Sequence, residues 1–145
     1  MDLNRVMRLM KQDIDEDWAH LDFSYQLKED DDGDEFLKIV ADLSVEGIDD
    51  DIRAYFIAYE SGSLLFRAIF DEIEATDEVL TLVNEYNSAN FYFTMTVSEE
   101  GYLSLFHVRP LANEEAYATY ASECLTRLVD ACEDNIMQAL TEYTK

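Results

Sequence analysis

The strongest constraint on the fold is a pair of strand-like segments joined by a turn too short to hold any other element. Residues 52–59 and 63–70 are rich in aromatic and β-branched side chains, and three residues ending in Gly62 separate them. Segments joined this closely pair as an antiparallel hairpin. Residues 23–28 and 36–45 are also of strand type and are expected to form a second hairpin. The sequence therefore predicts an antiparallel sheet.

Two further strands are predicted beyond residue 90. Residues 91–97 alternate apolar and polar side chains, and residues 102–108 return after a turn at Gly101. Pro110 is expected to end the returning strand, because proline has no N–H to donate to a neighbouring strand.

Helical spacing marks the start and the middle of the chain. Apolar residues recur every three or four positions through residues 3–14, and the carboxylates from Asp13 to Asp17 are expected to end that helix. Thr76 is a good N-cap for a second helix, which Asn87 is expected to terminate.

The last helix is predicted to be the longest. Asn113 is its expected cap, and an apolar stripe continues to about Tyr143 without a Pro or a Gly. Roughly 30 residues of helix span about 45 Å, which is longer than a domain of this size requires. We therefore expect part of this helix to project toward a partner or a second copy.

The predicted elements follow the order helix, four strands, helix, two strands, helix. Runs of strands kept apart from helices and joined by short turns are typical of the α+β class, in which helices pack on one face of an antiparallel sheet. No repeat, low-complexity linker or domain boundary divides the sequence. We expect residues 1–145 to form one domain.

The net charge of the chain limits the classes of molecule that it can bind. There are 33 Asp plus Glu against 10 Lys plus Arg, a formal charge of -23, yet 48% of the residues are hydrophobic, which argues against disorder. Nucleic acids and anionic bilayers are polyanions, so direct binding to either is disfavoured. Proteins with basic patches are suitable partners. As an alternative, the carboxylates could mimic nucleic acid and occupy the basic groove of a DNA-binding protein.

Eleven carboxylates fall between Asp13 and Glu35, so the charge is concentrated early in the sequence. The densest part is an acidic patch at the tip of the first predicted hairpin: Asp30, Asp31, Asp32, Asp34 and Glu35. A calcium-binding EF-hand with Gly33 at its sixth position would place Lys28 first and Ile39 twelfth, where carboxylates are required. We therefore predict a solvated acidic tip without a metal site, with weak divalent binding as the alternative.

Signatures of catalysis are missing from the sequence. It has no G-x-S-x-G, phosphate-binding loop, H-E-x-x-H or C-x-x-C motif, and its four glycines lie in separate turns. We predict a protein that is not an enzyme and uses no cofactor. The alternative is a Cys/His site in which Cys124 or Cys132 faces His107 between the sheet and the last helix.

The sequence also indicates a compartment. No apolar run approaches the roughly 18 residues of a membrane span, and the N-terminal residues lack the apolar core of a signal peptide. Cys124 and Cys132 lie eight residues apart on one predicted helix, about 12 Å along its axis and too far apart for a disulfide. Two unpaired thiols suggest a reducing, cytoplasmic location.

Aromatic side chains are the best candidates for a binding surface. Nine Tyr and eight Phe exceed what a core of this size must hold, and Tyr is common at interfaces because a hydroxyl ends a large apolar ring. We predict that four residues present a sheet surface to a protein partner: Tyr92, Phe93, Tyr102 and Phe106.

Three neighbouring motifs resemble the YbjN-like family. They are the helix end at residues 82–87 (LVNEYN), the aromatic strand at residues 91–97, and the turn and strand at residues 101–105 (GYLSL), ahead of a long C-terminal helix. The resemblance covers roughly residues 52–140. It implies a fold like that of the type III secretion chaperones, which are small, acidic and dimeric. It also implies a cytosolic sensory-transduction regulator or protein-binding module without catalytic activity, and it makes a homodimer one expectation.

Overall fold

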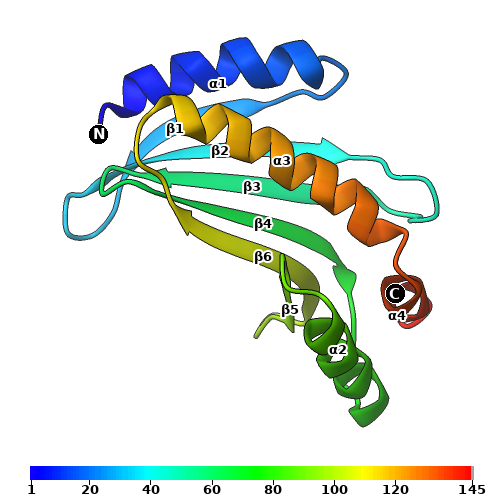
Figure 1. Cartoon of the computed structure of the whole chain (residues 1–145). Coiled ribbons are helices and arrows are strands. Elements are labelled where there is room, and N and C mark those ends of the chain that lie inside the picture. The colour runs from blue at the N-terminus through cyan, green and yellow to red at the C-terminus, as the bar shows by residue number, and fades with distance from the viewer. Residues whose placement is uncertain (145) are drawn as a thin grey trace.

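The computed structural model describes residues 1–144 of the chain, apart from the side chains of residues 15–17. Within this part, six strands pair into one antiparallel sheet with the spatial order β1-β2-β3-β4-β6-β5 (Figure 1). The strands are β1 (Ser24–Glu29), β2 (Glu35–Leu43), β3 (Ile52–Tyr59), β4 (Ser63–Glu72), β5 (Thr94–Val97) and β6 (Tyr102–Pro110). Because β1 pairs with β2 and β3 pairs with β4, both predicted hairpins are confirmed.

Side chains of the sheet alternate between two faces that differ in burial. In β3, Ala54 and Phe56 are buried, whereas Tyr55 between them is partly exposed. The helices α1 (Leu3–Asp17) and α3 (Glu115–Cys132) lie next to each other across the buried face (Figure 1). No helix of the described residues lies over the opposite face, which we call the open sheet face. The predicted α+β class with an antiparallel sheet is therefore confirmed.

Aromatic rings fill the core between the sheet and the two helices. The ring centroids of Phe56 and Phe66 lie 5.0 Å apart, and that of Phe93 lies 5.5 Å from Phe66. All three side chains are almost inaccessible to water. Burying a phenylalanine stabilises a fold by roughly 1.5–3 kcal/mol, so this stack is a major part of the core.

The first helix continues past the acidic residues that were expected to end it. It runs to Asp17, and the N–H of Trp18 donates to the carbonyl of Ile14 at 2.8 Å. The indole Nε1 of Trp18 then donates to the hydroxyl of Ser122 on α3 at 3.2 Å. Unfavourable charges at a helix C-terminus cost only about 0.3–1 kcal/mol each, and the packing of α1 on α3 outweighs them.

The second helix, α2 (Asp77–Ala89), begins at the predicted cap, because the N–H of Val79 donates to the hydroxyl of Thr76 at 3.3 Å. It ends two residues later than predicted. Asn87 does not break the helix, since its side chain bonds to the backbone of Met95. The amide of Asn87 donates to the Met95 carbonyl at 3.0 Å and accepts from the Met95 N–H at 2.7 Å.

The predicted long C-terminal helix is two helices. α3 ends at Cys132, and α4 (Asn135–Thr141) begins three residues later in a new direction (Figure 1). The Asp134 carboxylate accepts from the N–H groups of Ile136 and Met137 at 2.8 and 3.3 Å. An aspartate in this position is a strong helix N-cap. It therefore favours the start of α4 here over a continuation of α3.

The expectation of a projecting helix is therefore wrong. α4 packs against α2 instead, and the hydroxyl of Tyr143 donates to Glu78 at 3.1 Å. The other end of the segment was predicted correctly, because the Asn113 side chain accepts from the N–H of Ala116 at 3.0 Å.

Two smaller expectations concern the helices and the thiols. None of the helices described is both long enough and apolar enough to cross a membrane. Cys124 and Cys132 are both buried and unpaired, as their spacing predicted.

Candidate functional site

The open sheet face is a largely apolar surface built from neighbouring strands. Its central row crosses β2, β3, β4 and β6, with these residues opposite one another in register: Val40, Tyr55, Arg67 and Phe106. The same strands supply the apolar side chains around this row: Phe36, Ile57, Tyr59, Leu65, Ile69 and Val108. Most are partly exposed, and Val108 is 53% exposed. A contiguous apolar surface without a cover is typical of a protein interaction site.

The open sheet face carries several cationic side chains. Among the described residues, four of the chain's 10 Lys plus Arg lie on it: Lys28, Lys38, Arg53 and Arg67. The ammonium of Lys38 lies 5.2 Å from the ring centroid of Tyr55 on the adjacent strand. In a chain with 33 carboxylates, this face is the exception to the acidic surface.

The carboxylates that share the open sheet face already have partners. Arg53 donates to Asp42 through two nitrogens, at 2.9 and 3.2 Å, and this hydrogen-bonded pairing lowers the pKa of Asp42. The hydroxyl of Tyr102 donates to Glu72 at 3.3 Å. The strands of the described chain therefore offer no unpartnered carboxylate to the remaining cations of the face.

Arg67 is the least satisfied of these cations. Its Nε is buried and has no hydrogen-bond partner, and no carboxylate of the described residues forms an ion pair with it. A cavity of about 290 Å³ opens beside it, lined by Arg67, Ile69, Ser98, Glu100, Tyr102 and Ser104. Ser104 is 1% exposed, and its hydroxyl lies 3.0 Å from that of Thr96. The guanidinium of Arg67 therefore has no partner in the cavity, and the side chain of Glu100, which has no ion pair among the described residues, lines the same cavity.

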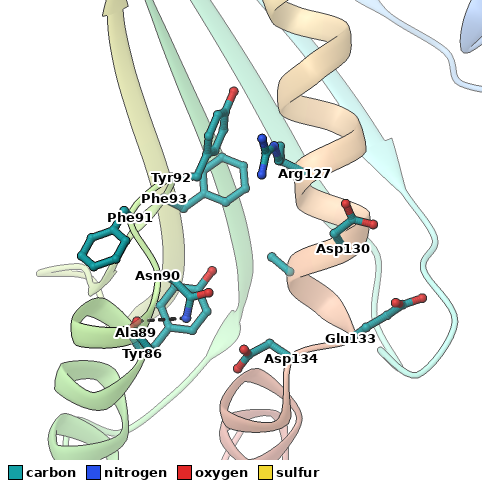
Figure 2. A pocket seen from close by; sticks show the side chains of 11 residues that line it. Tyr86, Ala89, Asn90, Phe91, Tyr92, Phe93, Arg127, Asp130, Glu133 and Asp134 are labelled. Carbon is teal, nitrogen blue, oxygen red and sulfur yellow. Dashed lines mark hydrogen bonds between the residues drawn. The ribbon is translucent and has the colours of Figure 1, made fainter.

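A second concave site lies on the other side of the sheet, between the end of α2 and the end of α3 (Figure 2). We call it the α3 cleft. Its volume is about 520 Å³, and it is lined by Tyr86, Ala89, Asn90, Phe91, Tyr92, Phe93, Arg127, Asp130, Ala131, Glu133 and Asp134. Aromatic side chains come from the α2 side, and charged side chains come from α3 and the turn after it. Phe91 stands at the rim and is 93% exposed.

Two charged residues of the α3 cleft are already engaged. The guanidinium of Arg127 lies 4.9 Å from the ring centroid of Tyr92. The carboxylate of Asp134 caps α4. Asp130 and Glu133 are exposed and form no ion pair among the described residues. In Figure 2 their side chains extend away from the aromatic side of the cleft.

The predicted Cys/His alternative can be examined directly. Tyr92 lies between the two groups: its ring stacks on His107 at 4.6 Å between centroids, and its hydroxyl lies 3.7 Å from Cys124 Sγ. His107 Nδ1 is hydrogen-bonded to the hydroxyl of Tyr120. Burial raises the pKa of Cys124 to about 12 and lowers that of His107. Both groups are therefore held neutral at pH 7, and the structure records no contact between His107 and Cys132.

The four predicted binding residues do not share one surface. Tyr102 and Phe106 lie on the open sheet face, as predicted. Phe93 is 3% exposed in the core, so the prediction is wrong for it as a surface residue. Tyr92 is partly exposed and lies outside the strands, on the covered side near α3, so it does not belong to the open sheet face. β5 begins only at Thr94, because the residues before it form the connection from α2.

The predicted acidic patch is an exposed, ordered turn between β1 and β2. The Asp30 carboxylate accepts from the N–H groups of Asp32 and Asp34, both at 2.9 Å. The other members of the patch, Asp31 and Glu35, are exposed. Within residues 1–144, no group of three or more His, Cys, Asp or Glu has the arrangement of a metal site. The carboxylate of Asp30 is used to close the turn.

Two residues that matter most in these sites were not predicted. Arg67 interrupts a strand otherwise rich in apolar side chains, and a lone cation at a period-two position was a usable signal. Phe91 carried no such signal, since it reads as the first residue of an alternating strand.

No protein-family model, curated protein or solved structure matches the chain. The resemblance to the YbjN-like family and to its chaperone-like fold therefore stays a prediction.

Proposed function

We propose that the chain is a non-enzymatic protein-binding module whose open sheet face receives an apolar, carboxylate-bearing segment of a partner protein. The observation that carries the proposal is Arg67, whose buried Nε has no acceptor at the centre of an apolar face. Leaving a buried donor unsatisfied costs roughly 1–3 kcal/mol. A carboxylate seated in the adjoining cavity would pair with the guanidinium and offset that cost, because the two groups match in shape and charge.

Charge complementarity supports an acidic segment over a basic one at this face. Asp42 and Glu72 are engaged by Arg53 and Tyr102, whereas Arg67 has no ion pair among the described residues. Adjacent strands lie about 4.8 Å apart, so neighbouring cations on the sheet act together within a Debye length of about 8 Å. At contact distance this local field would exceed the repulsion from the more distant carboxylates of the chain.

The state of the thiols supports the non-enzymatic part of the proposal. Burial raises the pKa of both Cys124 and Cys132 to about 12, so neither supplies a thiolate at neutral pH. A nucleophilic cysteine needs the opposite shift. Membership of the YbjN-like regulators and a chaperone-like fold belong to the same proposal, with the motif resemblance as their support. A cytoplasmic location is proposed from the two unpaired thiols.

Selection of displayed random peptides tests the function. The bait is the full chain, wild type or Arg67→Met, at physiological salt so that long-range charge effects are screened. Wild-type protein is expected to enrich peptides with Asp or Glu beside aromatic or aliphatic residues. Arg67→Met keeps a long apolar stem without the charge. It is expected to bind the enriched peptides about tenfold more weakly and to select peptides without the acidic preference.

Lys11→Met is the matched control, because Lys11 lies on α1 at the covered side of the sheet and the change removes the same charge. It is expected to select the same peptides as wild type. Enrichment of basic peptides, or equal affinity for Arg67→Met, would contradict the proposal. A wild-type dimer in sedimentation that Arg67→Met dissociates would identify a second copy as the occupant instead.

A further inference from the structure

We propose that the segment received by the open sheet face carries a basic side chain two residues from its carboxylate, and that the cavity beside Arg67 holds both charges. Arg67 would receive the carboxylate, and Glu100 would receive the ammonium or guanidinium. The inference rests on the function proposed above, which assigned only the carboxylate, and it names the second charge of the partner. The expected motif is an acidic residue, any residue, then a basic residue.

The two free charges of the cavity are opposite in sign. Arg67 and Glu100 both line it, and neither forms an ion pair among the described residues. The Nε of Arg67 is also buried without an acceptor. A carboxylate alone would satisfy the guanidinium, but the glutamate in the same cavity would repel it. A ligand that adds a positive group to its carboxylate complements both side chains.

The register of the strands gives the order of these groups along the cavity. On the open sheet face Arg67 lies opposite Phe106, and Tyr102 lies four residues earlier on β6, about 13 Å away along the strand. Glu72 lies opposite Tyr102 and accepts from its hydroxyl at 3.3 Å. Glu100 precedes β6, in the turn that follows β5. The cavity therefore has a cationic end at Arg67 and an acidic end around Tyr102.

The titration of Tyr102 shows that the Glu100 carboxylate acts at the acidic end. The pKa of Tyr102 is raised, chiefly by the charge of Glu72 and by the hydrogen bond with it. The charges of Asp71 and Glu100 raise the same pKa further. A cation beside the Tyr102 hydroxyl would be attracted by these carboxylates. It could also donate to the phenolic oxygen, whose own hydrogen is directed to Glu72.

Neutral groups lie between the two ends of the cavity. Ser104 is opposite Ile69 in the register and is 1% exposed. Its hydroxyl lies 3.0 Å from that of Thr96, and since one of the two donates to the other, one hydroxyl hydrogen stays available. Ile69 adds an apolar contact. This middle part can therefore receive the uncharged atoms that join the two charges of the ligand.

An extended segment would present its two charges at the required spacing. In a strand, side chains two residues apart point to the same side and lie about 6.7 Å from each other. The long side chains of Arg67 and Glu100 shorten the gap between the two ends of the cavity to a similar length. Adjacent residues point to opposite sides, so only one of their charges would enter the cavity. The spacing of two is therefore a specific property of the expected partner.

Titration of the full chain into fluorescently labelled, end-blocked peptides, followed by anisotropy at physiological salt, tests the inference. The peptides share a Thr/Val background and carry Glu-Val-Lys, Glu-Val-Gln or Glu-Lys-Val at their centre. Wild type is expected to bind the first about threefold more tightly than either of the others, which corresponds to one exposed ion pair. Glu-Lys-Val has the same net charge as Glu-Val-Lys, so it controls for the general attraction of lysine to an acidic chain.

Glu100→Gln is expected to bind the Glu-Val-Lys and Glu-Val-Gln peptides with equal affinity. Glu99→Gln is the matched control, because it removes the same charge from the preceding residue, which is exposed and does not line the cavity. It is expected to keep the threefold preference. Loss of the preference in both variants, or equal affinity of wild type for Glu-Val-Lys and Glu-Lys-Val, would overturn the inference.

The outcomes also separate this inference from the function on which it rests. If wild type binds Glu-Val-Lys and Glu-Val-Gln equally, and Arg67→Met weakens both, the second charge is wrong and the proposed function stands. If Arg67→Met weakens neither peptide, the proposed function fails as well. A last arm uses 5-aminopentanoate, which has both charges without a peptide backbone. Displacement of the Glu-Val-Lys peptide by this compound at a similar Kd would identify a small dipolar molecule as the occupant and overturn the assignment to a protein segment.

Discussion

Five of the nine tyrosines show two contrasting settings at the scale of single residues. Tyr86, Tyr117 and Tyr120 lie on helices and are almost fully buried, whereas Tyr55 and Tyr59 lie on the open sheet face. The sequence shows that tyrosines are abundant, but their alternation does not tell which face a helix covers. The buried tyrosines therefore pack in the core, whereas those on the open sheet face are available to a partner.

Cys124 and Cys132 are predicted to be inert toward thiol reagents in the native state. Their side chains are buried, and burial raises their pKa to about 12, so the reactive thiolate is scarce. Ellman's reagent at pH 7 is expected to label neither thiol within minutes and both within minutes in urea. Fast labelling of one thiol in the native protein would instead favour the Cys/His alternative.

His107 is predicted to make stability depend on pH. Burial is the main cause of its lowered pKa, and Arg109 adds to it. Above about pH 6.5 the imidazole is neutral in both the folded and the unfolded chain. Below that value the unfolded chain takes up the proton first, so the free energy of unfolding falls until the pH passes the folded pKa.

The measurement for His107 is urea unfolding of wild type and His107→Gln between pH 7 and pH 5. The wild type is expected to lose more stability over this interval than the variant, which lacks the imidazole of His107. Parallel pH profiles of the two proteins would show that His107 is not held neutral.

At the scale of elements, the hairpins were predictable and the end of the last helix was not. The turns at Gly62 and Gly101 have positive φ, of 100° and 87°, which favours glycine and marks them in the sequence. The start of α4 rests on one carboxylate, that of Asp134, inside a run of charged residues. No Gly or Pro lies between α3 and α4, so the sequence around their junction has the pattern of one continuous helix.

The candidate sites, like the helix ends, were predictable only where they depend on local sequence. Strand alternation is a local property that places Tyr102 and Phe106 on one face of β6, but it does not show which face a helix covers. The α3 cleft joins residues from the ends of α2 and α3, and it depends on how these elements pack. Local periodicity carries no information on that contact.

Asp134→Ala is predicted to destabilise the protein by about 1 kcal/mol, since the loss of an N-cap leaves the first N–H groups of α4 without an acceptor. Chemical denaturation measures the change. Asp130→Ala removes the same charge from an exposed position on α3 that caps nothing, and it is expected to change stability by less than about 0.5 kcal/mol. Equal effects of the two substitutions would mean that charge, and not capping, is responsible.

At the scale of the whole molecule, the net charge of -23 opposes compaction. Screening reduces repulsion between exposed carboxylates, so salt is predicted to stabilise the fold. The midpoint of urea unfolding is expected to rise between low and physiological concentrations of sodium chloride, and to rise equally with potassium chloride. A midpoint that is constant or falls with salt would contradict this prediction.

The cations of the open sheet face have a consequence for motion in solution. With four cationic side chains on the open face and carboxylates in excess over the rest of the surface, the protein is expected to have an electric dipole with a component normal to the sheet. A negatively charged partner would be repelled at long range, and at short range it would experience a torque that turns the open face toward it. The association rate with such a partner should therefore increase as salt is added, whereas that of a basic partner should decrease.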